Sequence, residues 1–153
     1  MTEFVLDNSV AMRWHLESEK AGDQKYAEDV LVSLADVSAR VPNLWHLEAA
    51  NVLVGAEKRG GTSIGEVERF IAQLENLPIK VDPLTASKSF TRVITLAREY
   101  KLSSYDAAYL ELAIREGLPL ATLDKGMIKA AKKADVTIYP GSRGEIEPPP
   151  RCA

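Results

Sequence analysis

Short apolar runs alternate with longer helical patterns along this 153-residue sequence, and this alternation restricts the fold more than any other feature. The apolar runs lie at residues 4–6, 39–42, 79–82, 119–122 and 136–139. Between them, apolar residues recur at the spacing of a helix face. Strands separated by helices form a parallel sheet with helices on both faces. The sequence therefore predicts an α/β fold whose sheet has five strands.

The organisation along the chain is that of one domain with a tail. Helices are expected at residues 23–37, 44–59, 62–77, 84–100, 102–113 and 125–134. Ser63 and Glu66 have the spacing of a capping box at the start of one of them. We expect a single domain over residues 1–141. Residues 142–153 are rich in glycine and proline, which predicts an extended or disordered tail.

Composition excludes several classes of protein. No apolar run approaches the roughly 20 residues that span a bilayer, and no signal-peptide pattern is visible, so we expect no membrane association. The single cysteine, Cys152, cannot form an intrachain disulfide, which fits a cytoplasmic protein. The net charge is −3, so the chain has no overall excess of basic residues of the kind that indicates binding to nucleic acid. RNA or DNA binding would require a local patch or a metal ion.

Four acidic residues occupy related places in this predicted fold. Asp7 directly follows the first strand, and Asp124 follows the fourth. Glu48 lies early in the helix after the second strand, and Asp106 lies in the first turn of the helix before the fourth. In parallel sheets the functional crevice lies outside the carboxyl ends of the strands. We therefore expect all four acids on one side of the sheet.

Each aspartate also has a purely structural explanation. Asp106 would favour the positive end of its helix dipole, with Ser103 as a cap partner. Asp7 and Asp124 would each cap the helix that starts at the next residue. These alternatives stay open on sequence alone.

Glu48 is harder to explain by structure alone. Its apolar neighbours in the helix are expected to be buried: Leu44, Leu47, Val52 and Leu53. An unpaired buried carboxylate is costly. Asn51 follows one turn later, where its amide is expected to hold Glu48 in place.

A cluster of carboxylates in one crevice indicates a cation site. The charges repel one another, and some of the groups take up protons unless a cation neutralises them. Mg²⁺ and Mn²⁺ prefer oxygen ligands and retain water. Such an ion activates water and stabilises charge on the attacking and leaving oxygens, which suits hydrolysis of a phosphodiester.

Four segments in this order resemble one known family. They are an apolar strand ending in Asp-x-Ser (Asp7, Ser9), the pattern Pro-x(n)-Glu-x-x-Asn-x-Leu (Pro42, Glu48, Asn51, Leu53), the helix "SSYDAAYLELA" with Asp106, and "LATLD" with Thr122 and Asp124. Each segment alone is weak, but together they cover nearly the whole chain. They resemble the PIN-domain family, most closely the VapC-type toxin ribonucleases of bacterial and archaeal toxin–antitoxin pairs.

This resemblance implies a three-layer α/β/α fold with a central parallel five-stranded sheet, and Mg²⁺- or Mn²⁺-dependent endoribonuclease activity. By residue, it implies that catalysis and metal binding fall to Asp7, Glu48, Asp106 and Asp124. Ser9 and Thr122 match hydroxyl positions that line such a site, and Asn51 matches a residue that orients the acids. The partners implied are an RNA substrate, a VapB-type antitoxin that covers the acidic groove, and a second copy in a homodimer.

The residues after Asp124 depart from the fuller family pattern. Some relatives carry a further acid two to four residues later, but here Lys125 and the three residues after it include none. We therefore expect one well-held ion, with a second bound weakly or only with substrate. Lys125 is either part of a solvated helix face or a contact for RNA phosphates.

Other chemistries fit less well. His46 and Glu48 have the spacing of a zinc deaminase His-x-Glu, but no downstream Cys-x-x-Cys exists. No phosphate-binding G-x-x-x-x-G-K-[ST] loop is present. A haloacid-dehalogenase-type phosphohydrolase would need an aspartate where this chain has Ser9. A catalytically silent PIN-like interaction module remains as an alternative, although such a module has no need to keep four acids.

Overall fold

The computed structural model describes residues 3–140, which form a parallel sheet between two layers of helices. The strands are β1 (Phe4–Leu6), β2 (Ala39–Pro42), β3 (Ile79–Asp82) and β4 (Leu120–Ala121). They lie in the order β3-β2-β1-β4, and all three neighbouring pairs are parallel. The predicted α/β class and parallel sheet are confirmed. Because β1 lies inside the sheet, its carboxyl end is flanked by strands on both sides.

The predicted fifth strand at residues 136–139 is wrong. Within residues 3–140 the sheet has four strands, and this segment contributes only an isolated parallel bridge between Leu120 and Ile138. Leu120 N–H donates to the Thr137 carbonyl, and Tyr139 N–H donates to the Leu120 carbonyl. β4 has only two residues, so it offers too short a ladder for a further strand, and Pro140 has no N–H to extend the pairing.

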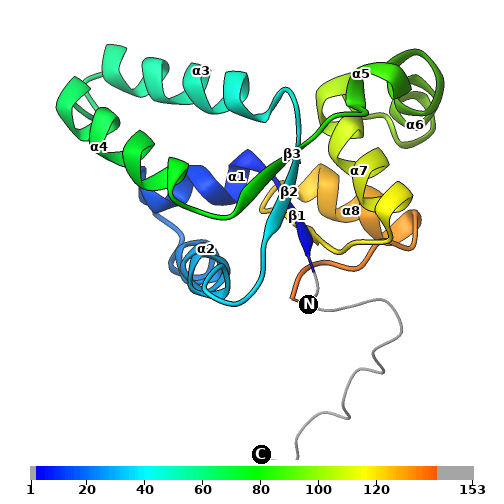
Figure 1. Ribbon diagram of the computed structural model, residues 1–153, viewed down its shortest axis with the longest axis horizontal. Coiled ribbons are helices and arrows are strands. Elements are labelled where there is room, and N and C mark those ends of the chain that lie inside the picture. Colours follow the sequence, from blue (N-terminus) through cyan, green and yellow to red (C-terminus); the bar gives the residue numbers. More distant parts are fainter. Residues whose placement is uncertain (1–2, 141–153) are drawn as a thin grey trace, which may run out of the picture.

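Helices cover both faces of the sheet (Figure 1). On one side lie α1 (Asn8–Ala11), the 3₁₀ turn η1 (Met12–Trp14), α2 (Ala21–Ser33), α3 (Trp45–Lys58) and α4 (Ile64–Glu75). On the other side lie α5 (Thr85–Lys88), η2 (Ser89–Val93), α6 (Ile94–Tyr100), α7 (Ser104–Glu116) and α8 (Lys125–Lys133). This is the expected three-layer α/β/α arrangement.

The helix predicted at residues 84–100 is interrupted. A π-helical turn, η2, separates α5 from α6. Ser87 and Ser89 donate their hydroxyls to the backbone carbonyls of Leu84 and Thr85, at 2.8 and 3.0 Å. Such local bonds compete with the regular helix ladder and bend it. The periodicity therefore predicted the helical segment but not the change of pitch inside it.

β1 and α7 form the centre of the core. All three residues of β1 are fully buried, as expected for a strand covered on both faces. In α7, every residue from Ala107 to Ala113 is buried. Asp106 lies just before this stretch, in the first turn of the helix. Packing of α7 against the sheet therefore fixes the position of Asp106 relative to β1.

The capping box at Ser63 and Glu66 is present at the start of α4, as predicted. The expected tail, residues 142–153, lies outside the described residues. Among residues 3–140, none of the helices is both long enough and apolar enough to cross a membrane.

Candidate active site

The four predicted acids come from four separate elements around the carboxyl end of β1. Asp7 follows β1, and Asp124 follows β4, which is its neighbour in the sheet. Glu48 lies in the first turn of α3 and Asp106 in the first turn of α7. These two helices flank the sheet on opposite sides (Figure 1). The parallel topology explains why acids more than 100 residues apart share one edge.

Asp7 is buried, with 6% of its surface exposed, and two hydroxyls anchor it. Its Oδ2 accepts hydrogen bonds from Ser9 Oγ at 2.7 Å and from Thr122 Oγ1 at 2.8 Å. Burial raises the pKa of the Asp7 carboxyl, the two hydroxyls oppose this, and the charges of Glu48 and Asp124 add to it. Ser9 and Thr122 therefore both contact Asp7 at the carboxyl end of β1.

Asp106 lies in the first turn of α7 and Asp124 is the N-cap of α8, so their structural explanations hold as well. Ser103 Oγ accepts the N–H of Asp106 at 3.1 Å, and Asp124 Oδ1 accepts the N–H of Met127 at 3.0 Å. Burial raises the pKa of Asp106 to about 6, and the charges of Asp7 and Asp124 contribute. Capping and a place in the acidic site are thus compatible for both residues.

Glu48 is half-buried and is held from across the fold. Its Oε1 accepts a hydrogen bond from the Tyr109 hydroxyl and lies 3.5 Å from Asn8 Nδ2. Burial raises the pKa of the Glu48 carboxyl, the bonds from Tyr109 and Asn8 oppose this, and the charge of Asp106 adds to it.

The four carboxyls share one electrostatic environment without a basic partner. In the part of the chain that the structure describes, none of them makes an ion pair with lysine or arginine. Asp7, Glu48 and Asp124 each have one oxygen anchored by the protein. Over residues 3–140 the second oxygen of each accepts no hydrogen bond, so it is available to a ligand.

The carboxylate oxygens of the four acids suit a hard cation, although the four side chains do not meet at one point. No group of three or more His, Cys, Asp or Glu side chains among residues 3–140 forms a ready-made metal cluster. Mg²⁺ keeps several of its waters and commonly uses only one or two carboxylates, so direct convergence of four acids is not required. Unanchored carboxylate oxygens with raised pKa values fit such an ion.

Two sequence predictions about the surroundings of Glu48 are wrong. Leu47, expected in the core, is 77% exposed. Asn51 is exposed, and no hydrogen bond within residues 3–140 joins it to Glu48. Asn51, three residues after Glu48, was expected to hold its side chain, but the Glu48 carboxylate is bound by Tyr109 of α7 instead. Lys125 is exposed at the start of α8, beside Asp124, so its proposed RNA contact stays a prediction.

The sequence analysis missed Tyr109 and Asn8 as members of the site. Tyr109 is fully buried, and a buried tyrosine hydroxyl usually has a partner. It lies three residues after Asp106, on the same face of the helix, which is the signal that points to it. Asn8 follows Asp7 directly and is 8% exposed, but nothing in its sequence context indicates that its amide reaches α3.

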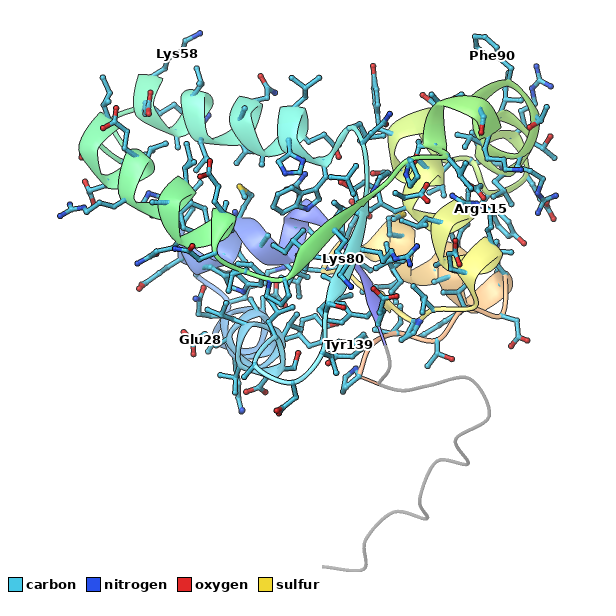
Figure 2. All side chains as sticks on the ribbon, in the orientation of Figure 1. Glu28, Lys58, Lys80, Phe90, Arg115 and Tyr139 are labelled. Atoms are coloured by element: carbon cyan, nitrogen blue, oxygen red, sulfur yellow. The ribbon has the colours of Figure 1, made fainter. Side chains whose placement is uncertain are left out.

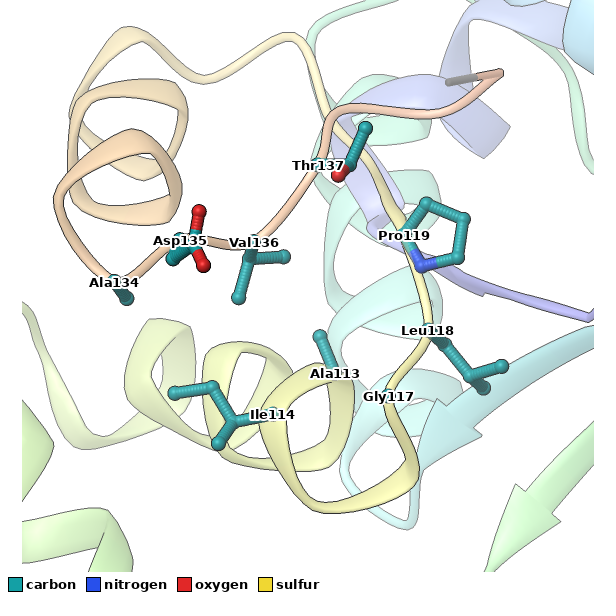
Figure 3. A pocket seen from close by; sticks show the side chains of 9 residues that line it. All are labelled: Ala113, Ile114, Gly117, Leu118, Pro119, Ala134, Asp135, Val136 and Thr137. Atoms are coloured by element: carbon teal, nitrogen blue, oxygen red, sulfur yellow. The ribbon is translucent and has the colours of Figure 1, made fainter. Parts of the chain in front are cut away.

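A separate small cavity lies away from the acids (Figure 3). It is between the end of α7 and the segment after α8, and its volume is about 40 Å³. Its lining includes Ala113, Gly117 and Val136 but none of the four acids. A space of this size holds only a few water molecules, so it is too small for a nucleotide of a nucleic-acid substrate.

Comparison with known proteins identifies the family. A model of the PIN domain matches residues 4–133. The crystal structure of PAE2754 from Pyrobaculum aerophilum is similar to this chain, with a TM-score of 0.61 and 21% sequence identity over 84% of this chain and 86% of that one. At this identity the likeness shows a shared fold. No curated protein sequence matched the chain. Because the family model spans most of the sequence, the protein belongs to the PIN-domain family.

Proposed function

We propose that this protein is a Mg²⁺- or Mn²⁺-dependent endoribonuclease and the toxin of a VapBC-type toxin–antitoxin pair. PIN domains are typically nucleases, which supports a hydrolase that acts on nucleic acid. The observation that carries the proposal is the group of four carboxyls around the end of β1, which share one electrostatic environment and have no basic partner among residues 3–140.

The residues that would hold the ion are Asp7, Glu48, Asp106 and Asp124. A bound divalent cation would neutralise these carboxylates and supply the Lewis acidity that phosphodiester hydrolysis needs. Ser9 and Thr122 hold Asp7 Oδ2, which directs Oδ1 away from the hydroxyls. The helix cap on α8 fixes Asp124 Oδ1 in the same way. We propose one well-held ion, because no acid follows Asp124 within four residues.

The proposed partner is a VapB-type antitoxin, and an apolar groove between α3 and α4 supports it. The groove has a volume of about 350 Å³. It is lined mainly by apolar residues, among them Trp45, Ala49, Leu53, Ile71, Leu74 and Ile79. An amphipathic helix places its apolar face into a groove of this kind. We also propose a homodimer, for which Phe90, 92% exposed on η2, offers an apolar contact (Figure 2).

The experiment that tests the nuclease function is cleavage of a mixed pool of structured RNAs with Mg²⁺, with Mn²⁺ and with EDTA. Asp7→Asn and Asp106→Asn are expected to lower the rate by about 100-fold or more, because each removes a carboxylate that would hold the divalent cation. Asp36→Asn is the matched control, since Asp36 is exposed just after α2. Equal cutting by all variants would indicate a contaminant. No cutting of any RNA would favour a silent interaction module.

A further inference from the structure

Glu48 is anchored differently from the other acids. Asp7 is held by Ser9 and Thr122, which lie beside it at the ends of adjacent strands. Glu48 lies on α3, and its Oε1 accepts the hydroxyl of Tyr109, which lies on α7. Tyr109 has no exposed surface, so its ring is fixed by the core around it. The hydroxyl therefore reaches Glu48 from a rigid support.

Asn8 completes this arrangement. Its Nδ2 donates to the backbone carbonyl of Trp45, the first residue of α3, at 3.0 Å. The same nitrogen lies 3.3 Å from the Tyr109 hydroxyl and 3.5 Å from Glu48 Oε1. Asn8 thus joins the end of β1 to the start of α3 and contacts both members of the Tyr109–Glu48 pair. It is buried, so water competes little for these bonds.

A glutamate needs such support more than an aspartate does. Its side chain has one more rotatable bond, so it loses more conformational freedom when one carboxylate oxygen is fixed. The neighbours of Glu48 on its own helix do not supply the support, because Leu47 and Asn51 are exposed. Over residues 3–140, the hydrogen bonds that reach the Glu48 carboxylate come from Tyr109 and Asn8 alone.

We propose that Tyr109, supported by Asn8, is a positioning residue that occupies Glu48 Oε1 and so presents Oε2 to the acidic site. This inference rests on the proposed metal-dependent nuclease function. Removal of a group that orients a metal ligand commonly lowers metal affinity by about 10–100-fold. The alternative is that the Tyr109 hydroxyl only satisfies a buried carboxylate and serves folding.

The test compares Tyr109→Phe with Tyr139→Phe. Both substitutions remove one hydroxyl from a buried tyrosine. Tyr139, which is labelled in Figure 2, stacks on Phe4, the first residue of β1, whereas Asp7 follows the last residue of that strand. Mn²⁺ affinity is measured by calorimetry, and kcat and KM are measured separately for RNA cleavage. Tyr109→Phe is expected to weaken Mn²⁺ binding by about 10-fold or more and to lower kcat. Tyr139→Phe is expected to leave both unchanged.

A double substitution separates positioning from a general effect on the fold. In a Glu48→Ala background, Tyr109→Phe has no carboxylate left to orient, so it is expected to cause no further loss of Mn²⁺ affinity. A full additional loss in that background would overturn the proposal, because Tyr109 would then act through something other than Glu48.

The outcomes distinguish this inference from the function on which it rests. If the wild-type protein binds Mn²⁺ and cleaves RNA, but Tyr109→Phe behaves like Tyr139→Phe, the positioning role is overturned and the nuclease function stands. If the wild-type protein neither binds Mn²⁺ nor cleaves RNA, both fall together. The positioning role is supported if Tyr109→Phe, but not Tyr139→Phe, weakens Mn²⁺ binding, and if Tyr109→Phe causes no further weakening in the Glu48→Ala background.

Discussion

Two buried aspartates end parallel strands of the same sheet, and their surroundings are opposite. Asp7 follows β1 and is 6% exposed, and Asp82 ends β3 and is 1% exposed. In the sequence both are simply an acid at the end of a short apolar run. Burial alone would raise the pKa of each carboxyl. What differs is whether the protein supplies a positive charge.

Asp82 is paired with a cationic side chain of the protein, that of Arg115. Its two oxygens accept from Arg115 Nη1 at 3.2 Å and Nη2 at 2.7 Å, and the same guanidinium contacts the buried Glu111 (Figure 2). Although burial opposes it, the pKa of the Asp82 carboxyl lies below its ordinary value because of the bonds and charge of Arg115. These acids and Arg115 form a structural ion-pair cluster.

Asp7 has no such partner. Its neighbours are hydroxyls and other acids, and its pKa is raised. A fold that can pair a buried aspartate with an arginine at β3 leaves the equivalent aspartate at β1 without one. The proposed divalent ion would supply at β1 the positive charge that Arg115 supplies at β3.

The largest expected loss of stability comes from removing the positive charge of Arg115. Arg115→Met leaves Asp82 and Glu111 buried without a counter-charge, and breaking a buried pair in this way costs about 3–5 kcal/mol. Chemical denaturation measures the free energy of unfolding. Arg40→Met is the control, because the contacts of Arg40 with Glu3 and Glu116 are partly exposed and are expected to contribute at most about 1 kcal/mol. Equal losses in both variants would contradict the account.

Thr122→Val probes the hydroxyl anchor of Asp7 and is expected to have an intermediate effect. The Thr122 hydroxyl donates to Asp7 and accepts the N–H of Asp124 at 3.1 Å. Valine has the same shape but no hydroxyl, so buried polar groups lose a partner at a cost of about 1–3 kcal/mol. Urea unfolding measures the loss, and Thr122→Ser, which keeps the hydroxyl, is expected to cost less. A stable Thr122→Val protein would show that the anchor is unimportant.

The smallest expected effect is a gain in stability from Asp106→Asn in EDTA. The pKa of Asp106 is about 6 in the folded protein and near its ordinary 3.8 when unfolded, so the folded form holds the proton more tightly between these values. Stability present below pH 3.8 is therefore lost as the pH rises through about 6.

Asparagine has no proton to lose, so Asp106→Asn is expected to be more stable above pH 6 and equal to the wild type near pH 4. Because Asp106 is partly exposed, the gain is discounted to about 1 kcal/mol, or roughly 2–4 °C in Tm. Thermal unfolding across this pH range measures it. A gain of the same size at pH 4 would point to a cause other than ionisation.

Two of the four acids could be placed from the predicted topology, because they follow neighbouring strands. Asp7 and Asp124 follow adjacent parallel strands, so knowing that the strands are parallel is enough to place them at one edge. Ser9 and Thr122 were expected from the family resemblance, and both contact Asp7. Family resemblance and strand order therefore predicted which residues lie together at the strand ends.

Contacts between distant side chains could not be predicted in this way. The Tyr109–Glu48 and Arg115–Asp82 contacts each depend on how α7 packs against other elements, which no local pattern records. Asn51 was assigned to Glu48 because it is close in sequence, yet the carboxylate finds its partners across the fold. The prediction of a fifth strand failed because β4, with two residues, forms only an isolated bridge with residues 136–139 and not a continuous ladder.

The most direct test is the same substitution at both strand-end aspartates, with Tm measured in EDTA and in Mn²⁺. We predict that in EDTA Asp7→Asn raises Tm, because repulsion is relieved, whereas Asp82→Asn lowers it, because the Arg115 pair is weakened. Mn²⁺ is predicted to stabilise the wild type and Asp82→Asn but not Asp7→Asn. If both substitutions lower Tm equally and Mn²⁺ stabilises none of the three proteins, the end of β1 is not a cation site.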